Sequence, residues 1–367
     1  MTSPAKATTA TVAVVQAGSV LFDPSACVDK AVRLIGEAAA TGAKIVLFPE
    51  AFITGYPKGL NYGLVVGARD AVGREEFRLY LDAAIEVPGS ETERLGEAAA
   101  ANGTYVVMGA IERELGTCYC TVLFFGPDGR FLGKHRKLVP TFPEKMVWSR
   151  GDGSGMRVWE TDIGRLGTLA CGENSNTLAR FALLAQGEQV HVANYPALGL
   201  STKLGQNTWI HLRAGAHSCE GKVFTLVSTS TINQEMIEML GDTEGKRQFL
   251  SSANAYSAIY GPNGEVLTSI EGKEGIIYAE IDIEQEIIHK QWHDITGHYN
   301  RFDVLSLNLN MDEDQPINFI TRRPPSPDSD LATTEAMIKL LEQSQAEQQE
   351  LRKAIGLLSQ RLGEEGK

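Results

Sequence analysis

The stretch Arg165-Leu-Gly-Thr-Leu-Ala-Cys171-Gly-Glu-Asn-Ser-Asn176 connects a short apolar run to a helical pattern that continues through residues 177–184. The apolar residues up to Ala170 predict the end of a buried strand. Gly172 permits a tight turn after Cys171, and the asparagine and serine side chains that follow are good helix caps. The stretch therefore predicts a strand–turn–helix unit of an α/β fold, with a cysteine at the turn.

The position of Cys171 suggests chemistry as well as structure. A thiol at such a turn would face free N–H groups and the positive end of a helix dipole, which lower a cysteine pKa from ~8.5 into the range ~3.5–7.5 and favour the thiolate. A buried structural thiol is the alternative, because free cysteine is among the most buried residue types. The partners that the rest of the chain supplies decide between the two.

The overall composition excludes several classes of protein. The chain has 367 residues, 43% of them hydrophobic, which is ample for a well-buried core. Its net charge of −12 argues against nucleic acid or an anionic membrane as a partner. No apolar run approaches the ~20 residues of a spanning helix, residues 1–11 lack the apolar core of a signal peptide, and five scattered cysteines do not make a disulfide framework. We therefore expect a cytoplasmic protein.

Strand and helix patterns alternate along most of the chain. Predicted strands cover residues 11–16, 44–48, 105–111, 121–125, 130–138, 189–194, 223–229, 256–260, 265–270 and 275–283; predicted helices cover 29–40, 92–101 and 209–220, and 55–87 is a long excursion with some helix. Two hairpins carry near-identical turns, Gly126-Pro-Asp-Gly129 and Gly261-Pro-Asn-Gly264, which indicates an internally duplicated α/β unit. Two sheets packed face to face and covered by helices would use all of these elements.

Three charged side chains lie at or near predicted strand ends, as Cys171 does. Glu50 follows the strand 44–48, Lys137 lies near the end of 130–138, and Glu144 lies in the loop beyond it. Strand exits of a parallel layer gather at one edge, so these groups are able to meet. A cysteine then serves as nucleophile, a carboxylate as base, and an ammonium stabilises developing negative charge. A solvated strand end is the alternative for Glu50.

Alternation along two strands assigns further side chains to faces. His135 and Lys137 share one face of the strand 130–138 and Arg136 takes the other, so one face must direct charge toward whatever packs on it. Cys118 and Cys120 share one face of the preceding strand, where core packing is favoured over chemistry.

Several motifs, in the same order, resemble the nitrilase branch of the carbon–nitrogen hydrolase superfamily over about residues 11–308. They are Phe48-Pro-Glu50-Ala-Phe-Ile-Thr-Gly-Tyr-Pro57; His135-Arg-Lys137-Leu-Val-Pro-Thr141 with Glu144, Trp148 and Gly151-Asp-Gly-Ser154; Cys171-Gly-Glu-Asn174; Asn194-Tyr-Pro196; and Gly297-His-Tyr-Asn-Arg-Phe-Asp-Val-Leu305. The resemblance implies an α/β fold arranged as a four-layer αββα sandwich.

The resemblance also implies a catalytic set. Glu50 corresponds to the general base, Lys137 to the stabilising cation, Cys171 to the nucleophile, and Glu144 to a second glutamate that holds the site and shares in proton transfer. The implied reaction converts a small-molecule nitrile to the carboxylic acid and ammonia through covalent thioimidate and thioester intermediates. It needs no metal or organic cofactor, because the thiol supplies the nucleophile and the lysine the electrophilic help.

One residue departs from the common pattern. Many nitrilases have tryptophan directly after the nucleophile, and this chain has Gly172, so the shape of the pocket and the choice of substrate are open. The Gly172 N–H is expected to add to the charge-stabilising pocket. Tyr56 and Trp148 correspond to positions near the pocket wall and are predicted to bind substrate with Gly172; core aromatics are the alternative.

The predicted organisation has four parts: a flexible N-terminus (1–10), a nitrilase-like hydrolase domain (11–308), a linker (309–330) and a helical tail (331–367). In the tail, apolar and polar residues in 4-3 spacing predict a coiled-coil seam for oligomerisation or docking, with a solvated tail as the alternative: Met337, Leu341, Ser344, Gln348, Leu351, Ile355, Leu358 and Leu362. Subunits of this family pair and build spirals or filaments, so a homo-oligomer is expected.

Two rival functions remain at this stage. An amidase of the same superfamily would use the same residues on an amide, although the motifs around 135–154 favour a nitrilase. A non-catalytic scaffold that assembles through its tail would be expected to have lost one of Glu50, Lys137 or Cys171, and all three are present.

Overall fold

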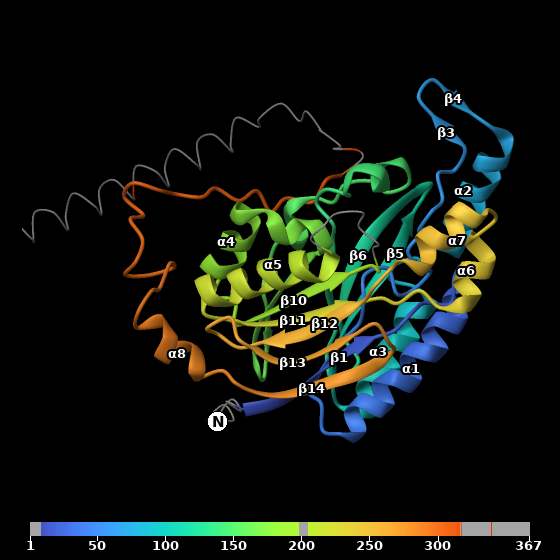
Figure 1. Cartoon of the computed structure of the whole chain (residues 1–367). Helices are drawn as coiled ribbons and strands as arrows, with labels where there is room; N and C mark the ends of the chain where they lie inside the picture. Colours follow the sequence, from blue (N-terminus) through green and yellow to red (C-terminus); the bar gives the residue numbers. More distant parts are fainter. Residues whose placement is uncertain (1–8, 198–204, 316, 318–338, 340–367) are drawn as a thin grey trace, which may run out of the picture. The chain divides into compact units, whose positions relative to one another are not determined.

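In the computed structural model of this chain, residues 9–197 and 205–315 are described, together with Ile317 and Lys339. The unit considered below ends at Asp314 (Figure 1). The predicted coiled-coil seam and most of the predicted linker lie outside the described residues. The first strand begins at Thr9, two residues before its predicted start.

Two six-stranded sheets form the centre of the unit. The first has the order β14 (Gly275–Asp282), β1 (Thr9–Gln16), β2 (Ile45–Leu47), β5 (Tyr105–Glu114), β6 (Thr117–Phe125) and β7 (Phe131–Arg136). The second has the order β13 (Val266–Glu271), β12 (Tyr256–Tyr260), β11 (Phe224–Thr229), β10 (Val190–Tyr195), β9 (Gly164–Ala170) and β8 (Trp159–Thr161). A short hairpin, β3 (Leu64–Val65) with β4 (Ala68–Arg69), stands apart from both.

The two sheets have the same construction. In the first, β1, β2 and β5 are parallel, and antiparallel strands flank them on both sides. In the second, β9, β10 and β11 are parallel and are flanked in the same way. The hairpins β6–β7 and β12–β13 occupy corresponding places. The topology therefore agrees with the duplicated unit that the two related turns predicted.

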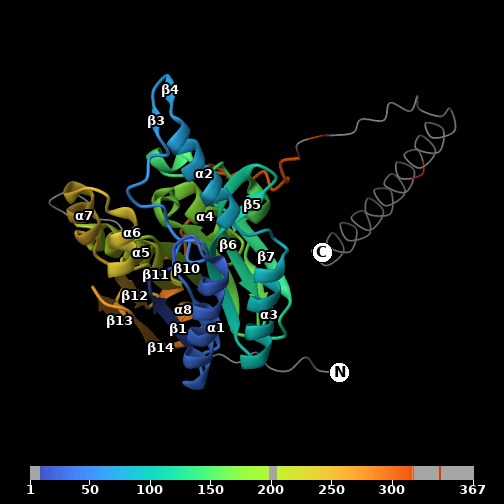
Figure 2. The ribbon, with the colours of Figure 1, turned by 90° about the vertical axis from the view of Figure 1, so that its right-hand side faces the viewer.

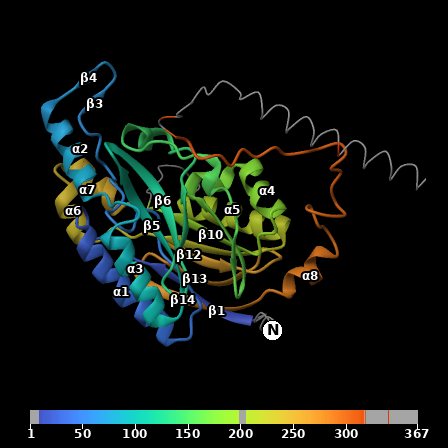
Figure 3. The same ribbon diagram turned by 180° about the vertical axis from the view of Figure 1, so that it is seen from behind.

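Helices cover the outer face of each sheet. Figures 1 and 3 show α1 (Pro24–Ala40) and α3 (Ser90–Asn102) on one side of the pair of sheets, and α4 (Thr177–Ala185) and α5 (Gln206–Gly221) on the other. Figure 2 shows α1 and α3 packed side by side. The arrangement is the four-layer αββα sandwich that was predicted.

The alternation of side chains along β1 shows why the sheet is covered on both faces. Val12 and Val14 face the other sheet, while Ala13 and Val15 pack under the helices. Because both faces are covered, the strand is apolar on both, and each buried Å² of apolar surface contributes about 25 cal/mol. Between the sheets, Phe124 stacks on Trp159 with ring centroids 3.8 Å apart.

The remaining helices were missed or only partly predicted. The excursion 55–87 contains α2 (Ala71–Ala83), and α6 (Gln234–Leu240) and α7 (Glu244–Ser251) lie between β11 and β12, with α8 (Gln285–Lys290) after β14. Their apolar residues are few, so the periodic signal is weak. Helix α1 begins at Pro24, five residues before its predicted start, because the Asp23 carboxylate caps it by accepting from the Ala26 N–H at 2.9 Å. Among the helices of the described residues, none combines the length and apolar character that a membrane crossing requires.

Candidate active site

Glu50 lies in the tight turn that follows β2, and its side chain is buried. The turn crosses β5 at Gly109, where an added Cβ would lie 2.0 Å from the Pro49 carbonyl oxygen. Only glycine permits that close approach. The solvated strand end considered for Glu50 is therefore wrong, since the turn directs the carboxylate into the protein.

Lys137 follows the last residue of β7 and holds two carboxylates. Its ammonium donates to Glu50 Oε1 and to Glu144 Oε2, both at 2.7 Å, and the lysine side chain is fully buried. Glu144 lies in a 3₁₀ turn (Phe142–Met146) and also accepts from the Thr141 N–H at 2.6 Å and the Tyr56 hydroxyl at 2.9 Å. The structure thus brings Glu50, Lys137 and Glu144 together.

Burial sets the protonation of this group. Burial raises the pKa of Glu50 to about 7, with the Glu144 charge adding to the rise and the Lys137 charge opposing it. Burial alone would lower the pKa of Lys137, but the charge of Glu50, with that of Glu144, outweighs it and holds that pKa well above its ordinary value. Glu50 Oε2 has no hydrogen-bond partner among the described residues. The site therefore holds a permanent cation beside a carboxylate with one open oxygen.

Cys171 begins a five-residue 3₁₀ turn (Cys171–Ser175) directly after β9. Its φ is +47°, in the left-handed region that costs a non-glycine residue about 1–3 kcal/mol. The thiol is 5% exposed and packs in an apolar cluster with Ala193, Tyr195 and Ala214. The strand–turn–helix unit is confirmed, and the cysteine lies in a constrained backbone conformation.

The sequence predicted a thiolate at Cys171, but the surroundings of this residue in the fold favour the protonated thiol. Burial, and next the Glu50 charge, raise the pKa of Cys171 above its ordinary value, and the Lys137 charge only partly opposes them. The expected help of a helix dipole is missing because α4 begins at Thr177, where Asn176 caps it, and not at the cysteine. The proton must therefore leave the sulfur during the reaction.

Glu173 and His135 stabilise the turn that carries Cys171, and the sequence analysis assigned a role to neither residue. The Glu173 carboxylate accepts from the Ala170 N–H at 2.8 Å and the Leu138 N–H at 2.5 Å, and it lies 3.0 Å from His135 Nε2. Burial would raise the pKa of Glu173, but His135 and these N–H donors lower it. The contact ties the chain beside Lys137 to the turn that carries Cys171. The predicted alternation of His135 and Lys137 was the available signal.

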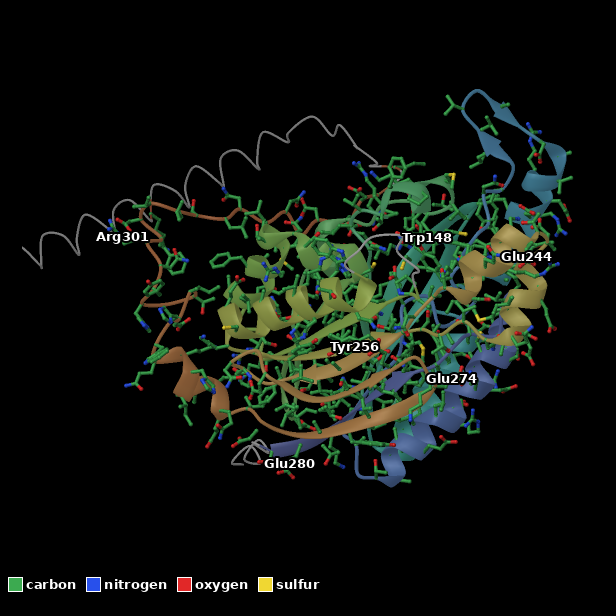
Figure 4. The ribbon with its side chains drawn as sticks, viewed as in Figure 1. Trp148, Glu244, Tyr256, Glu274, Glu280 and Arg301 are labelled. Carbon is green, nitrogen blue, oxygen red and sulfur yellow. The ribbon has the colours of Figure 1, made fainter. Side chains whose placement is uncertain are left out.

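The two predicted aromatic residues contact the charged group. Trp148, labelled in Figure 4, meets the Tyr56 ring edge-on at 5.5 Å, and its ring lies 5.7 Å from Lys137 Nζ. Trp148 is 3% exposed and donates to the Tyr80 hydroxyl at 3.1 Å, whereas Tyr56 is half-buried. Both side chains therefore support Lys137 or Glu144 directly.

Two smaller residues complete the surroundings. A Cβ at Gly172 would lie 2.9 Å from the Thr141 side-chain oxygen, so the turn after the nucleophile packs against the segment that holds Glu144. Cys120 donates from its thiol to Glu50 Oε1 at 3.3 Å, while Cys118 packs in an apolar cluster. The prediction of core packing is confirmed for Cys118. It is incomplete for Cys120, because the alternation of side chains along a strand does not show which groups a buried face contacts.

Comparisons with known proteins show the family to which this chain belongs. The carbon–nitrogen hydrolase family model matches residues 11–287. Nitrilase 3 of Arabidopsis thaliana is 40% identical over 323 residues, which are 86% of this chain and 90% of that protein. A bifunctional nitrilase/nitrile hydratase of Lupinus angustifolius is 42% identical, covering 88% of this chain and 91% of that protein.

Solved structures share the fold at lower identity. The carbon–nitrogen hydrolase from Helicobacter pylori superimposes with a TM-score of 0.63 and 17% identity, covering 81% of this chain and 96% of that one. Saccharomyces cerevisiae Nit3, of the nitrilase superfamily, gives 0.62 and 23%, covering 81% and 98%. This chain belongs to the carbon–nitrogen hydrolase family, and within it to the nitrilase branch.

The charged group makes a stability prediction. Lys137→Met leaves two buried carboxylates without their cation and should lower the free energy of unfolding by about 3–5 kcal/mol. Losing the lysine raises the Glu50 pKa further, and a carboxyl whose pKa is raised by folding favours the folded state less as pH rises. Urea unfolding should therefore show a larger deficit at pH 8 than at pH 5.

Lys134→Met is the matched control on β7, because its partner Glu112 keeps a second cation in Arg136. Its cost should be at most about 1 kcal/mol and nearly independent of pH. Equal costs for both variants would contradict the assigned role of Lys137.

Proposed function

We propose that this chain is a nitrilase that hydrolyses an organic nitrile to the carboxylic acid and ammonia, with Cys171 as nucleophile. One observation carries the assignment of roles: a buried lysine holds two carboxylates 2.7 Å away, beside a constrained buried thiol. Glu50 is the general base, Lys137 the stabilising cation, and Glu144 the group that holds the lysine. The curated relatives favour this reaction over the amidase and the scaffold.

The first step joins sulfur to the nitrile carbon. Glu50 accepts the thiol proton as the sulfur adds and passes it to the nitrile nitrogen, which becomes the N–H of a thioimidate. Lys137 stabilises the negative charge that develops on that nitrogen. Because the pKa of the thiol is raised and that of Glu50 is about 7, proton transfer and carbon–sulfur bond formation are coupled.

Two water molecules complete the reaction. Glu50 activates the first, which adds to the thioimidate; the carbon–nitrogen bond then breaks and ammonia leaves, giving a thioester. The second water adds to the thioester, the carbon–sulfur bond breaks, and the acid leaves with the Cys171 thiol restored. If the carbon–sulfur bond of the first adduct breaks instead, the product is the amide. A relative described as a bifunctional nitrilase/nitrile hydratase supports that second outcome.

Tyr56, Trp148 and Gly172 are proposed to shape the substrate site. Tyr56 is half-buried and contacts Glu144, and Trp148 meets the Tyr56 ring edge-on. Gly172 adds no side chain beside the nucleophile, and its N–H is proposed to stabilise charge on the substrate. The substrate is an aliphatic nitrile, an aromatic nitrile, an arylacetonitrile or cyanide, and a panel of these compounds with product analysis identifies the class.

Assembly into a homo-oligomer, by pairing and then by spiral or filament growth, is also proposed. Large apolar side chains gather in exposed positions on and after α8, where a monomer rarely leaves so many: Ile287 (71% exposed), Ile288 (62%), Trp292 (80%), Tyr299 (63%), Phe302 (54%), Val304 (66%) and Leu305 (67%). A cytoplasmic location is supported by the free thiols of all five cysteines, and cell fractionation tests it.

Replacing the nucleophile tests the reaction. Cys171→Ala should reduce ammonia release from nitriles by on the order of 10⁴-fold or more, because no covalent intermediate forms. Cys219→Ser, at an exposed cysteine, should leave the rate unchanged. Ammonia is measured from paired nitriles and amides. Turnover of amides alone would make the protein an amidase, and turnover by Cys171→Ala would exclude the mechanism.

The pH profile tests the base. Protonated Glu50 cannot accept the thiol proton, so kcat/KM should rise with pH through about 7 and fall about tenfold per unit below it. The Cys120 hydrogen bond lowers the pKa of Glu50, so Cys120→Ala should move this limb to higher pH. A rate that does not change between pH 5 and pH 8 would remove Glu50 as the base.

Sizing tests the assembly. A double variant, Ile288→Glu with Trp292→Glu, should shift the protein to smaller species in light scattering. Leu178→Glu introduces one such charge at an exposed residue of α4 and should not change the size. Truncation after Asp330 separates a contribution of the tail. An assembly unchanged by the double variant would exclude the apolar segment as the interface.

A further inference from the structure

A buried cluster of ionisable side chains lies outside the residues assigned above. Glu188 precedes β10, His191 lies on β10 and His217 lies on α5, and all three are at most 1% exposed. Glu188 Oε1 lies 2.7 Å from His191 Nδ1, and Glu188 Oε2 lies 2.8 Å from His217 Nε2. The cluster places one carboxylate between two imidazoles.

A carboxylate with two imidazoles is also a donor set for a metal ion. The contacts here are hydrogen bonds, because each imidazole nitrogen lies within 2.8 Å of a different carboxylate oxygen. The second nitrogen of His191 faces Asn174 Oδ1 at 2.8 Å. The arrangement therefore describes a hydrogen-bonded chain that leads from Glu188 toward Asn174.

The orientation of Asn174 identifies the charge on His191. Its amide nitrogen donates to the Leu169 carbonyl at 2.7 Å and the Cys171 carbonyl at 3.1 Å, so its oxygen must face the histidine. An amide oxygen only accepts, and so does a carboxylate. Both ring nitrogens of His191 must then donate, which makes His191 an imidazolium paired with Glu188.

The surrounding charges agree with that assignment. Burial would raise the pKa of Glu188, but His191 and His217 lower it to about 2. Burial, the His191 charge and Arg180 lower the pKa of His217 to about 4. His217 is thus the neutral imidazole of the cluster. From α8, Glu286 also faces the pair, and burial chiefly raises its pKa to about 8.

The fold makes room for this ion pair. His191 lies beside Gly167 in the β9–β10 register, and a Cβ at Gly167 would lie 2.0 Å from Glu188 Oε1. Any other residue there would displace the carboxylate. Glycine in the middle of a buried strand costs stability, so the position marks a place where another group must approach closely.

We propose that the Glu188–His191 ion pair positions the nucleophile by orienting the Asn174 amide, which in turn holds the Cys171 carbonyl and its left-handed backbone. The four groups form one chain of hydrogen bonds that ends at the nucleophile's own residue. Glu188 and His191 are positioning residues, since neither touches the sulfur. The inference rests on the proposed role of Cys171 as the nucleophile.

His191→Phe tests the chain while keeping a ring in the same place. Phenylalanine has no N–H to donate, so the Asn174 oxygen loses the donor that faces it. The amide then turns away from the Cys171 carbonyl. We expect kcat to fall about 10–100-fold with KM changed less than about threefold, since a small misplacement of a reacting group costs this much.

His217→Phe is the matched control, because it removes the other hydrogen bond to the same carboxylate but has no contact with Asn174. Its kcat should stay within about threefold of the parent value, even though its melting temperature falls. An equal loss of kcat in both variants would overturn the proposal, since a structural defect alone would then explain it.

A double-mutant cycle shows whether the ion pair acts through the amide. His191→Phe added to Asn174→Ala should reduce kcat no further, because the amide that His191 orients is gone. Losses of kcat that multiply in the double variant would overturn the proposal. If His191→Phe does not fold, His191→Leu enters the same cycle with the same expectation.

Alkylation of Cys171 by iodoacetamide, followed by mass spectrometry of its peptide, repeats the cycle without any nitrile. The alkylation rate should fall in His191→Phe and stay unchanged in His217→Phe. Positioning of Cys171 is therefore tested even if the protein does not act on nitriles. A failure of the positioning proposal can thus be distinguished from a failure of the proposed nitrilase activity. Elemental analysis of the purified protein should find no stoichiometric metal; one metal ion per chain would overturn the hydrogen-bond assignment.

Discussion

The rest of the site depends on one buried ammonium that two carboxylates share. Lys137 lies 2.7 Å from both Glu50 and Glu144, and all three side chains are buried. Each buried ion costs several kcal/mol of desolvation, so the arrangement is stable only when every member is present. Burial chiefly raises the pKa of Glu50 to about 7 and also raises the pKa of the Cys171 thiol, and the neighbouring carboxylate charges add to both shifts. A base of intermediate strength then faces a thiol that must give up its proton.

The duplicated architecture explains how these groups meet. Glu50 follows a parallel strand of one sheet, and Cys171 follows the corresponding kind of strand in the other. The site therefore lies between two halves that pack face to face, and neither half holds it alone. Glu173 joins them, because its carboxylate binds both the Ala170 N–H at the cysteine turn and the Leu138 N–H beside Lys137. The packing between the two sheets therefore also determines the geometry of the site.

Much of this could be predicted from residue patterns. Apolar runs located most strands, the related turns at 126–129 and 261–264 indicated the duplication, and Glu50, Lys137, Glu144 and Cys171 followed from strand ends and motif order. Short polar helices such as α7 escaped, because one buried leucine makes no periodic signal. The supporting residues Glu173, His191 and Cys120 escaped too, because each acts through a partner far away in sequence.

The sequence by itself determined the layer order, the family and the identity of the charged residues, since these depend on local periodicity and on residue types at fixed spacing. Only the tertiary structure decided their protonation. Helix-dipole reasoning at Cys171 predicted a thiolate, whereas burial and the Glu50 charge keep the thiol protonated. Likewise, His191 is an unremarkable strand residue until Glu188 and Asn174 face its two nitrogens. A pKa depends on desolvation and on charges brought close by folding, and neither quantity is local in sequence.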